Sequence, residues 1–170
     1  MFEHAASWIA FIIVMVTEKI SMDNLIDQDA VYAGYMTIKP EPNGLSAARR
    51  QMQRIASDLD FSEDDMACFI IAVGEAISNA YRHGTPDLKS NYIYLGWRFA
   101  NEILTVTVRD EGSGFIPDAV NLDEAQHRSI SGHGISIMRS SVDAVHFEFE
   151  DGATVVLEKK WKAQRGERRN

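Results

Sequence analysis

Glu75 and Asn79 have types and spacing that could do chemistry, because they lie one helical turn apart in a segment of helical periodicity. The apolar residues of this segment fall on one stripe of a helix that begins near Ser62: Met66, Phe69, Ile70, Val73, Ile77, Ala80 and Tyr81. The opposite side is small and nearly uncharged, with Cys68, Ala72, Glu75 and Asn79. We therefore predict that neighbouring elements cover both sides of this helix.

A carboxylate and a carboxamide on a covered helix need polar partners, since leaving either one unpaired costs about 1–3 kcal/mol. A bound ligand would supply those partners. The same short spacing also fits ordinary polar residues near the end of a helix that Gly84 terminates, so the pair alone leaves both interpretations open. Cys68 shares this side and is expected to be a small buried residue.

Three later features indicate a phosphorylated ligand. They are Asp110 followed by Gly112 and Gly114 at the end of a predicted strand, Gly132 and Gly134 at the start of a predicted helix, and Thr154 at the start of the last predicted strand. Glycines at a helix start let the backbone approach an anion and direct free N–H groups at it. Asp110 can accept a hydrogen bond from an exocyclic amine, and the Asn79 oxygen suits Mg²⁺ on phosphates. Each feature alone has an ordinary explanation as a turn glycine, a cap or a strand threonine, but together they fit a purine nucleoside triphosphate.

The elements that must position these residues alternate between helices and hairpins. Strands are predicted at residues 31–38, 92–99, 103–109, 142–149 and 154–161, and helices from Asn43 or Ser46 to 57, from 62 to 84 and from 135 to 141. About twenty polar residues before Ser131 lack periodicity, which is typical of a functional lid or binding loop. Strands in hairpins and helices in runs predict an α+β fold, a two-layer sandwich whose mainly antiparallel sheet is covered on one face by helices.

The composition limits the classes of function. The 170 residues fit one domain, and the net charge of −8 argues against a nucleic-acid-binding surface. The single cysteine, Cys68, excludes a disulfide framework and predicts a reducing compartment such as the cytoplasm. Residues 162–170 are expected to form a solvated basic tail.

Residues 5–16 are almost purely apolar, but they are too few for the roughly 20 residues that span a bilayer. Neither a basic flank nor a convincing cleavage site marks them as a secretory signal. Three interpretations stay open: an additional helix that packs on the domain, a true start at Met15 or Met22, or a weak membrane or partner contact. We favour the first two. The chain therefore divides into an apolar extension at 1–30, a functional domain at 31–161 and a basic tail at 162–170.

The residues named above resemble the motifs of the GHKL ATPase superfamily, which unites gyrase, heat-shock chaperone, histidine-kinase and mismatch-repair ATP-binding domains. The matching positions are Glu75-x-x-x-Asn79-Ala80-x-x-His83-Gly84, Asp110-x-Gly112-x-Gly114-Phe115 and Gly132-His133-Gly134-Ile135. The resemblance covers about residues 31–161. Within the superfamily, the chain looks most like the small bacterial anti-sigma-factor serine/threonine kinases. Ile135 stands where leucine is commoner in the family, and Ser131 where a glycine is frequent.

This resemblance implies a Bergerat-type fold that binds ATP with Mg²⁺. Glu75 would be the catalytic base toward a serine hydroxyl, Asn79 the magnesium ligand, and Asp110, assisted by Thr154, the adenine reader. The other implied ATP-binding residues are His83, Gly112, Gly114, Gly132, His133, Gly134 and Ile135. The implied partners are a sigma factor and an anti-sigma-factor antagonist protein, and homodimerisation is implied by the family alone.

Two functions of different classes fit these residues. The first is an ATP-dependent serine kinase that also binds a sigma factor and phosphorylates a small antagonist. The second is a nucleotide-gated protein-binding regulator without phosphotransfer, which could keep every residue named here. The catalytic part of a histidine kinase is disfavoured, because His4 is the only histidine before Glu75 and no long dimerisation helix would carry a phosphoacceptor. Chaperone and DNA-strand-passing ATPases are expected to need more domains than 170 residues hold.

Overall fold

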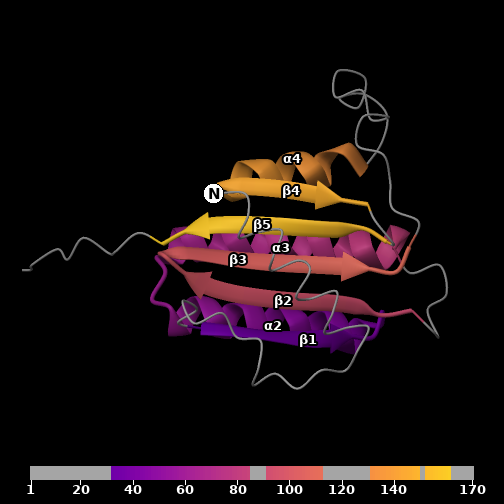
Figure 1. Ribbon diagram of the computed structural model, residues 1–170, viewed down its shortest axis with the longest axis horizontal. Coiled ribbons are helices and arrows are strands. Elements are labelled where there is room, and N and C mark those ends of the chain that lie inside the picture. Colours follow the sequence, from indigo (N-terminus) through magenta and orange to yellow (C-terminus); the bar gives the residue numbers. More distant parts are fainter. Residues whose placement is uncertain (1–31, 85–90, 113–130, 150–151, 162–170) are drawn as a thin grey trace, which may run out of the picture.

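The computed structural model describes residues 32–84, 91–112, 131–149 and 152–161. Within these ranges five strands form one sheet in the order β1-β2-β3-β5-β4, and all neighbouring pairs are antiparallel. The strands are β1 (Tyr32–Ile38), β2 (Ile93–Ala100), β3 (Ile103–Asp110), β4 (Ala144–Glu148) and β5 (Thr154–Lys160). Helices α2 (Pro42–Asp58), α3 (Glu63–His83) and α4 (Ser131–Ser141) lie on one face of the sheet (Figure 1). The predicted α+β two-layer sandwich is confirmed.

The hydrophobic core lies between the sheet and these helices. Its largest fully buried side chains come from both layers: Phe69, Ile38, Met52, Ile55, Ile93, Leu95, Leu104, Met138, Leu157, Val73, Val106 and Val108. Along β3 the buried residues Leu104, Val106 and Val108 alternate, as expected for a strand with one face toward the helices. This packing fixes α3 against the sheet and so places Glu75 and Asn79 relative to the strand ends.

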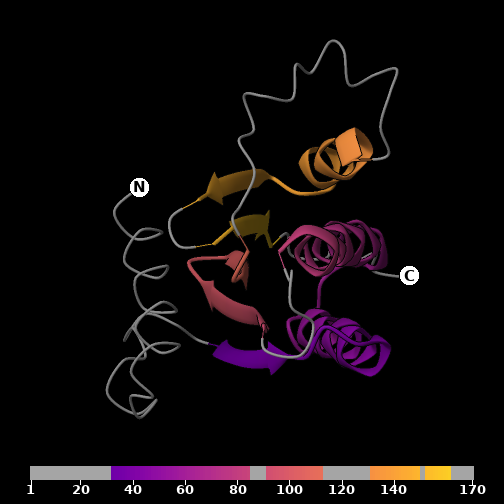
Figure 2. The ribbon, with the colours of Figure 1, turned by 90° about the vertical axis from the view of Figure 1, so that its right-hand side faces the viewer.

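The central helix α3 runs between α2 and α4 (Figure 2). Ser62 caps its start, since the Ser62 hydroxyl oxygen accepts a hydrogen bond of 3.2 Å from the Asp65 N–H. The helix ends at His83, and the Gly84 N–H donates to the Ala80 carbonyl at 2.8 Å. The cap and the extent of this helix are as the sequence predicts.

The side of α3 that carries Glu75 and Asn79 is covered from Ala72 onward. Ala72 and Ala76 are at most 1% exposed, and their small side chains let neighbouring elements approach closely. Cys68, by contrast, is exposed. Its expected burial is therefore wrong, because the cover over this side begins only at Ala72, one turn later.

The β2–β3 hairpin turns at Asn101 and Glu102, which have positive φ angles of 51° and 61°. Two such residues form the kind of tight turn that matches the twist of antiparallel strands. The register of this hairpin pairs Ile93 with Asp110 at its open end. The predicted hairpin is confirmed, and it places Asp110 at the end of the central strand β3, beside the end of α3.

Three elements, α2, α4 and β4, differ from the predictions by more than one residue at an end. Helix α2 begins at Pro42 after an extended Glu41, not at Asn43 or Ser46, because proline is well suited to the first turn of a helix. Helix α4 begins at Ser131 instead of residue 135, so Gly132, His133 and Gly134 lie in its first turn. Strand β4 is shorter than the predicted 142–149.

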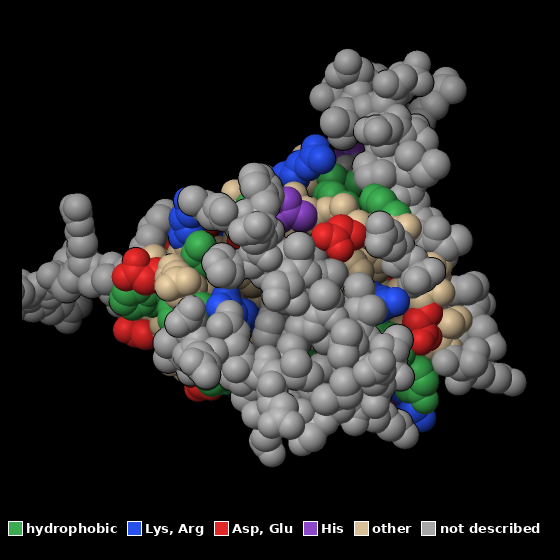
Figure 3. All heavy atoms as spheres, in the orientation of Figure 1, with side chains coloured by type: hydrophobic (Ala, Val, Ile, Leu, Met, Phe, Trp, Pro, Cys, Tyr) green, Lys and Arg blue, Asp and Glu red, His purple; other side chains and the backbone are tan. Residues whose placement is uncertain are grey.

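Several expectations fall outside the described residues: the apolar extension at 1–30, the lid between 113 and 130 with Gly114, and the tail at 162–170. In the described part of the chain, no helix is long and apolar enough to cross a membrane. On the face seen in Figure 3, the described Lys and Arg side chains are interspersed with Asp and Glu side chains and form no continuous basic stripe.

Candidate functional site

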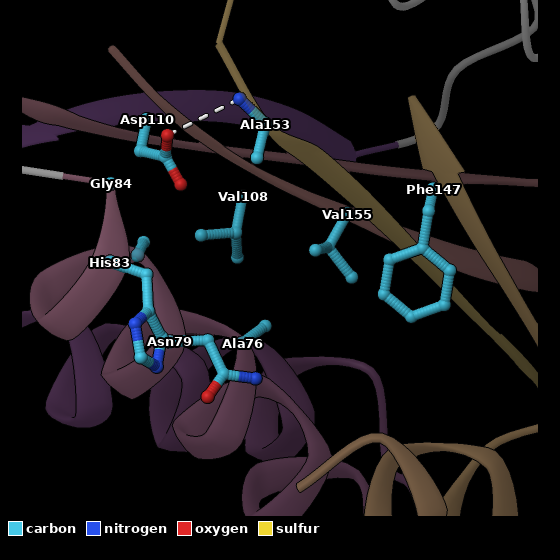
Figure 4. A pocket seen from close by; sticks show the side chains of 10 residues that line it. Ala76, Asn79, His83, Gly84, Val108, Asp110, Phe147, Ala153 and Val155 are labelled. Carbon is cyan, nitrogen blue, oxygen red and sulfur yellow. Dashed lines mark hydrogen bonds between the residues drawn. The ribbon is translucent and has the colours of Figure 1, made fainter. Parts of the chain in front are cut away.

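A cleft lies between the second half of α3 and the strand ends on the sheet (Figure 4). Its lining combines small and apolar side chains with a few polar groups: Ala76, Asn79, Ala80, His83, Gly84, Val108, Asp110, Phe147, Ala153 and Val155. The cleft is open to solvent, and the empty space in and around its mouth, including part of that solvent, is about 420 Å³. Val108 and Val155 form an apolar surface between the polar groups of α3 and Asp110. A flat aromatic ring fits such a surface.

Asp110 is the polar group on the sheet side of this cleft. One oxygen, Oδ1, accepts hydrogen bonds from the Gly112 N–H at 2.9 Å and from the Ala153 N–H at 3.2 Å. The residue is only 5% exposed, and burial raises the pKa of its carboxyl above the ordinary value. The two N–H bonds and the charges of Arg109 and His83 lower this pKa without cancelling the effect of burial.

The second oxygen of Asp110, Oδ2, lies beside Gly84, where an added Cβ would overlap the carboxyl group. A Cβ on Gly112 would in turn lie 2.5 Å from the Gly84 Cα. Glycine at both positions is therefore required for the end of α3 to pack against the end of β3. This close packing holds a carboxylate acceptor at the end of an apolar cleft, an arrangement suited to a base with an exocyclic amine.

Glu75 and Asn79 meet the first turn of α4. A Cβ added at Gly134 would lie 3.0 Å from Glu75 Oε2 and 3.4 Å from Asn79 Nδ2. The start of a helix carries free N–H groups and the positive end of the helix dipole. A carboxylate, a carboxamide and a glycine-containing helix start thus converge at one place next to the cleft.

Some of the residues predicted for the site line the cleft, and others lie outside it. Asn79, His83 and Asp110 line the cleft, and Glu75 and Gly134 adjoin it. Three further candidates are not among the described residues of the lining: Gly112 packs on Gly84, His133 is exposed, and Ile135 belongs to the hydrophobic core. Gly132 lies in the first turn of α4.

Thr154 does not assist Asp110 from within the cleft. Ala153 and Val155 line the cleft, and side chains alternate along a strand, so the Thr154 side chain lies on the opposite face of the sheet. Ala153 takes the expected place, and its backbone N–H contacts Asp110. The alternation of side chains along the strand that follows Gly152 would have predicted that Ala153 and Val155, and not Thr154, lie on the side of the cleft.

Phe147 on β4 is a further site residue and lies outside the motifs found in the sequence. It lines the cleft, and its ring stacks on Phe149 with centroids 6.5 Å apart and planes 3° from parallel. The sequence predicts only that Phe147 points inward. Its place in the cleft depends on the order of strands β5 and β4.

A Mg²⁺ ion in this cleft would need only one oxygen ligand from the protein, because bound phosphates and waters would supply the others. Among the described residues there is no cluster of three or more His, Cys, Asp or Glu side chains that could hold a metal ion. Mg²⁺ commonly keeps several waters and takes one or two protein oxygens together with substrate phosphates. The Asn79 side-chain oxygen, beside Glu75 and the start of α4, fits that requirement.

The fold and this cleft define a nucleotide-binding α+β domain of the ATPase and kinase class. The histidine kinase-like ATPase domain family matches residues 38–159, most of the chain. The chain belongs to this family.

The curated relatives are bacterial regulators. The serine-protein kinase RsbW of Bacillus subtilis is 25% identical over 138 residues, which cover 76% of this chain and 86% of the relative. The anti-sigma F factor of Geobacillus thermodenitrificans is 32% identical over 124 residues, 67% of this chain and 82% of the relative. Among solved structures, the RsbU and RsbW domains of a Mycobacterium tuberculosis protein share the fold with a TM-score of 0.59 at 17% identity, over 76% of this chain and 32% of that one.

Proposed function

We propose that this protein is an ATP-dependent serine protein kinase that acts as an anti-sigma factor in the cytoplasm. It binds a sigma factor and phosphorylates a small antagonist protein, and the phosphorylation state of the antagonist decides which partner it holds. The observation that carries the proposal is the convergence of Glu75, Asn79 and the first turn of α4 beside a cleft that ends in Asp110. The names of the relatives, serine-protein kinase and anti-sigma F factor, support the substrate and the partners.

The two ends of the cleft orient ATP, because one end binds the adenine and the other the triphosphate. Asp110 Oδ2 accepts a hydrogen bond from the adenine amine while the apolar surface of Val108 and Val155 contacts the ring. The triphosphate then extends toward the start of α4, where the free N–H groups of a helix N-terminus favour an anion. Asn79 would hold Mg²⁺, which would supply positive charge to neutralise the phosphates.

Glu75 is the proposed general base. Its carboxylate takes the proton of the antagonist's serine hydroxyl as the serine oxygen bonds to the γ-phosphorus and the bond to the β-γ bridging oxygen breaks, releasing ADP. A serine hydroxyl is a poor nucleophile, so a base in reach contributes about 10²–10⁴ in rate. Positioning and the metal supply much of the remainder.

The test is phosphotransfer to a candidate antagonist by the wild-type protein, by Glu75→Gln and by the control Glu63→Gln, an exposed glutamate at the start of α3. We expect Glu75→Gln to lose at least about 100-fold in transfer rate and to bind MgATP as the wild type does. Normal transfer by Glu75→Gln would contradict the role of the base. MgATP binding by the wild type that gates a sigma factor, with no phosphoserine formed on any partner, would favour a nucleotide-gated regulator.

A further inference from the structure

Glu111, the residue after Asp110, ties the end of β3 to the start of β2. Glu111 Oε2 accepts hydrogen bonds from the Tyr92 N–H at 2.8 Å and from Asn91 Nδ2 at 3.2 Å. The other oxygen, Oε1, accepts one from the Tyr94 hydroxyl at 2.8 Å. A single carboxylate thus binds three residues, Tyr94 in β2 and Asn91 and Tyr92 just before it.

These bonds lie where the backbone pairing of the hairpin stops. The last described pair of β2 and β3 is Ile93 with Asp110, so the Tyr92 N–H has moved beyond the ladder and finds the Glu111 side chain instead. On the other side of Glu111, the Gly112 N–H donates to Asp110 Oδ1. Glu111 therefore connects the start of β2 to the turn in which the Gly112 N–H orients the Asp110 carboxylate.

The charge state strengthens this connection. Partial burial by itself would raise the pKa of Glu111, but the hydrogen bonds from Tyr92, Tyr94 and Asn91, with the charge of Arg109, together lower it. Burial and the bond to Glu111 raise the pKa of Tyr94 to about 12. At neutral pH the pair is thus a carboxylate and a neutral phenol, and hydrogen bonds to an ionised group are the stronger kind.

We propose that Glu111 is a positioning residue for base recognition: its three hydrogen bonds hold the end of β3 so that Asp110 Oδ2 faces the exocyclic amine of the bound purine. Glu111 is not among the described residues that line the cleft. The inference rests on the nucleotide recognition in the proposed function and adds a residue that positions Asp110, the group that selects the base. A base without the exocyclic amine cannot donate this hydrogen bond to Asp110. The ratio of affinities for bases with and without the amine therefore reports how well Glu111 positions Asp110.

The experiment is calorimetric titration of Mg-ADP and Mg-IDP, whose hypoxanthine lacks the amine, into four full-length proteins. They are the wild type, Glu111→Gln, Tyr94→Phe and the control Glu102→Gln, an exposed glutamate at the opposite end of the same hairpin. We expect the wild type and the control to prefer ADP. Glu111→Gln should lose about tenfold of that preference, mostly through weaker ADP binding, and Tyr94→Phe a smaller part. Thermal unfolding of each variant is measured alongside.

The outcomes separate this inference from the proposed function. If the wild type binds ADP and prefers it to IDP while Glu111→Gln keeps the full preference, the inference is wrong and the proposed function stands. Equal weakening of both nucleotides with a lower melting temperature would show that Glu111 only stabilises the fold, and would also overturn it. If the folded wild type binds neither nucleotide, the proposed function fails together with the inference.

A double substitution checks the path through Asp110. In an Asp110→Asn background the base reader is already altered, so adding Glu111→Gln should change the ADP preference by less than about twofold. A further tenfold loss in that background would mean that Glu111 acts independently of Asp110, which contradicts the positioning role.

Discussion

Gly134, in the first turn of α4, lies against Glu75 so closely that a Cβ at position 134 would be 3.0 Å from Glu75 Oε2. The same Cβ would be 3.4 Å from Asn79 Nδ2. The two helices therefore meet at the proposed base and the proposed magnesium ligand. Any side chain at position 134 must displace one of them.

Gly134→Ala is expected to slow phosphotransfer more than it destabilises the fold. The Glu75 carboxylate must move a few tenths of an ångström to accept the new methyl group, and small displacements of catalytic groups are costly, up to about 100-fold in rate for a shift near 1 Å. The measurement is single-turnover transfer together with thermal unfolding. A variant with the wild-type rate would show that Glu75 has no fixed position during transfer.

Asn79→Ala is expected to remove the magnesium-dependent part of ATP affinity. Loss of a ligand to a charged group should weaken MgATP binding by about tenfold or more, while binding measured in excess chelator should change little. Ser78→Ala is the matched control, because Ser78 lines a separate groove between α2 and α3. Equal weakening with and without magnesium would contradict the assigned role.

The local part of this structure is predictable from the sequence, and the long-range part is not. The stripe from Met66 to Tyr81 and the Ser62 cap involve residues a few positions apart, so periodicity and residue type suffice to predict α3. The β2–β3 hairpin is equally local. The contact between Gly84 and Asp110 joins two residues that are far apart in the sequence, and only the packed fold shows why position 84 must be glycine.

The errors in the predicted site come from the same cause. The family motif implies Thr154 as the partner of Asp110, whereas strand alternation and the register with β3 place Ala153 there. Phe147 was predicted to point inward, but its place in the cleft depends on β4 pairing with β5 at the edge of the sheet. The start of α2 at Pro42 is not among the predicted boundaries, because a proline that follows a strand is compatible both with the end of that strand and with the first turn of a helix.

Asp110→Asn is expected to keep the fold and lose adenine recognition. The asparagine oxygen can accept the same two bonds from the Gly112 and Ala153 N–H groups, which leaves an NH₂ donor facing the donor amine of adenine. We expect MgATP binding to weaken about 10- to 100-fold. Titration calorimetry and circular dichroism check the two parts separately. Tight ATP binding by a folded Asp110→Asn protein would place the base elsewhere.

The raised pKa of Asp110 gives a pH dependence whose sign is opposite to that of most carboxylates. Between the ordinary value of 3.8 and the raised native value, the folded protein binds more protons at Asp110 than the unfolded chain does. Stability contributed by this group is therefore greatest at low pH and falls as the pH rises through that window. The Asp110→Asn variant has no such pH-dependent cost at this position, because an amide does not ionise.

We therefore expect the stability of Asp110→Asn relative to the wild type to increase as the pH rises from below about 4 toward neutrality, and then to level off. The affinity of the wild type for ATP should weaken as the pH falls through the same window. Protonated Asp110 presents a hydrogen-bond donor instead of an acceptor to the adenine amine. Denaturant unfolding and ATP titration of both proteins across this range measure the two curves. If the stability difference is flat with pH, the Asp110 carboxyl titrates at its ordinary value and burial does not govern it.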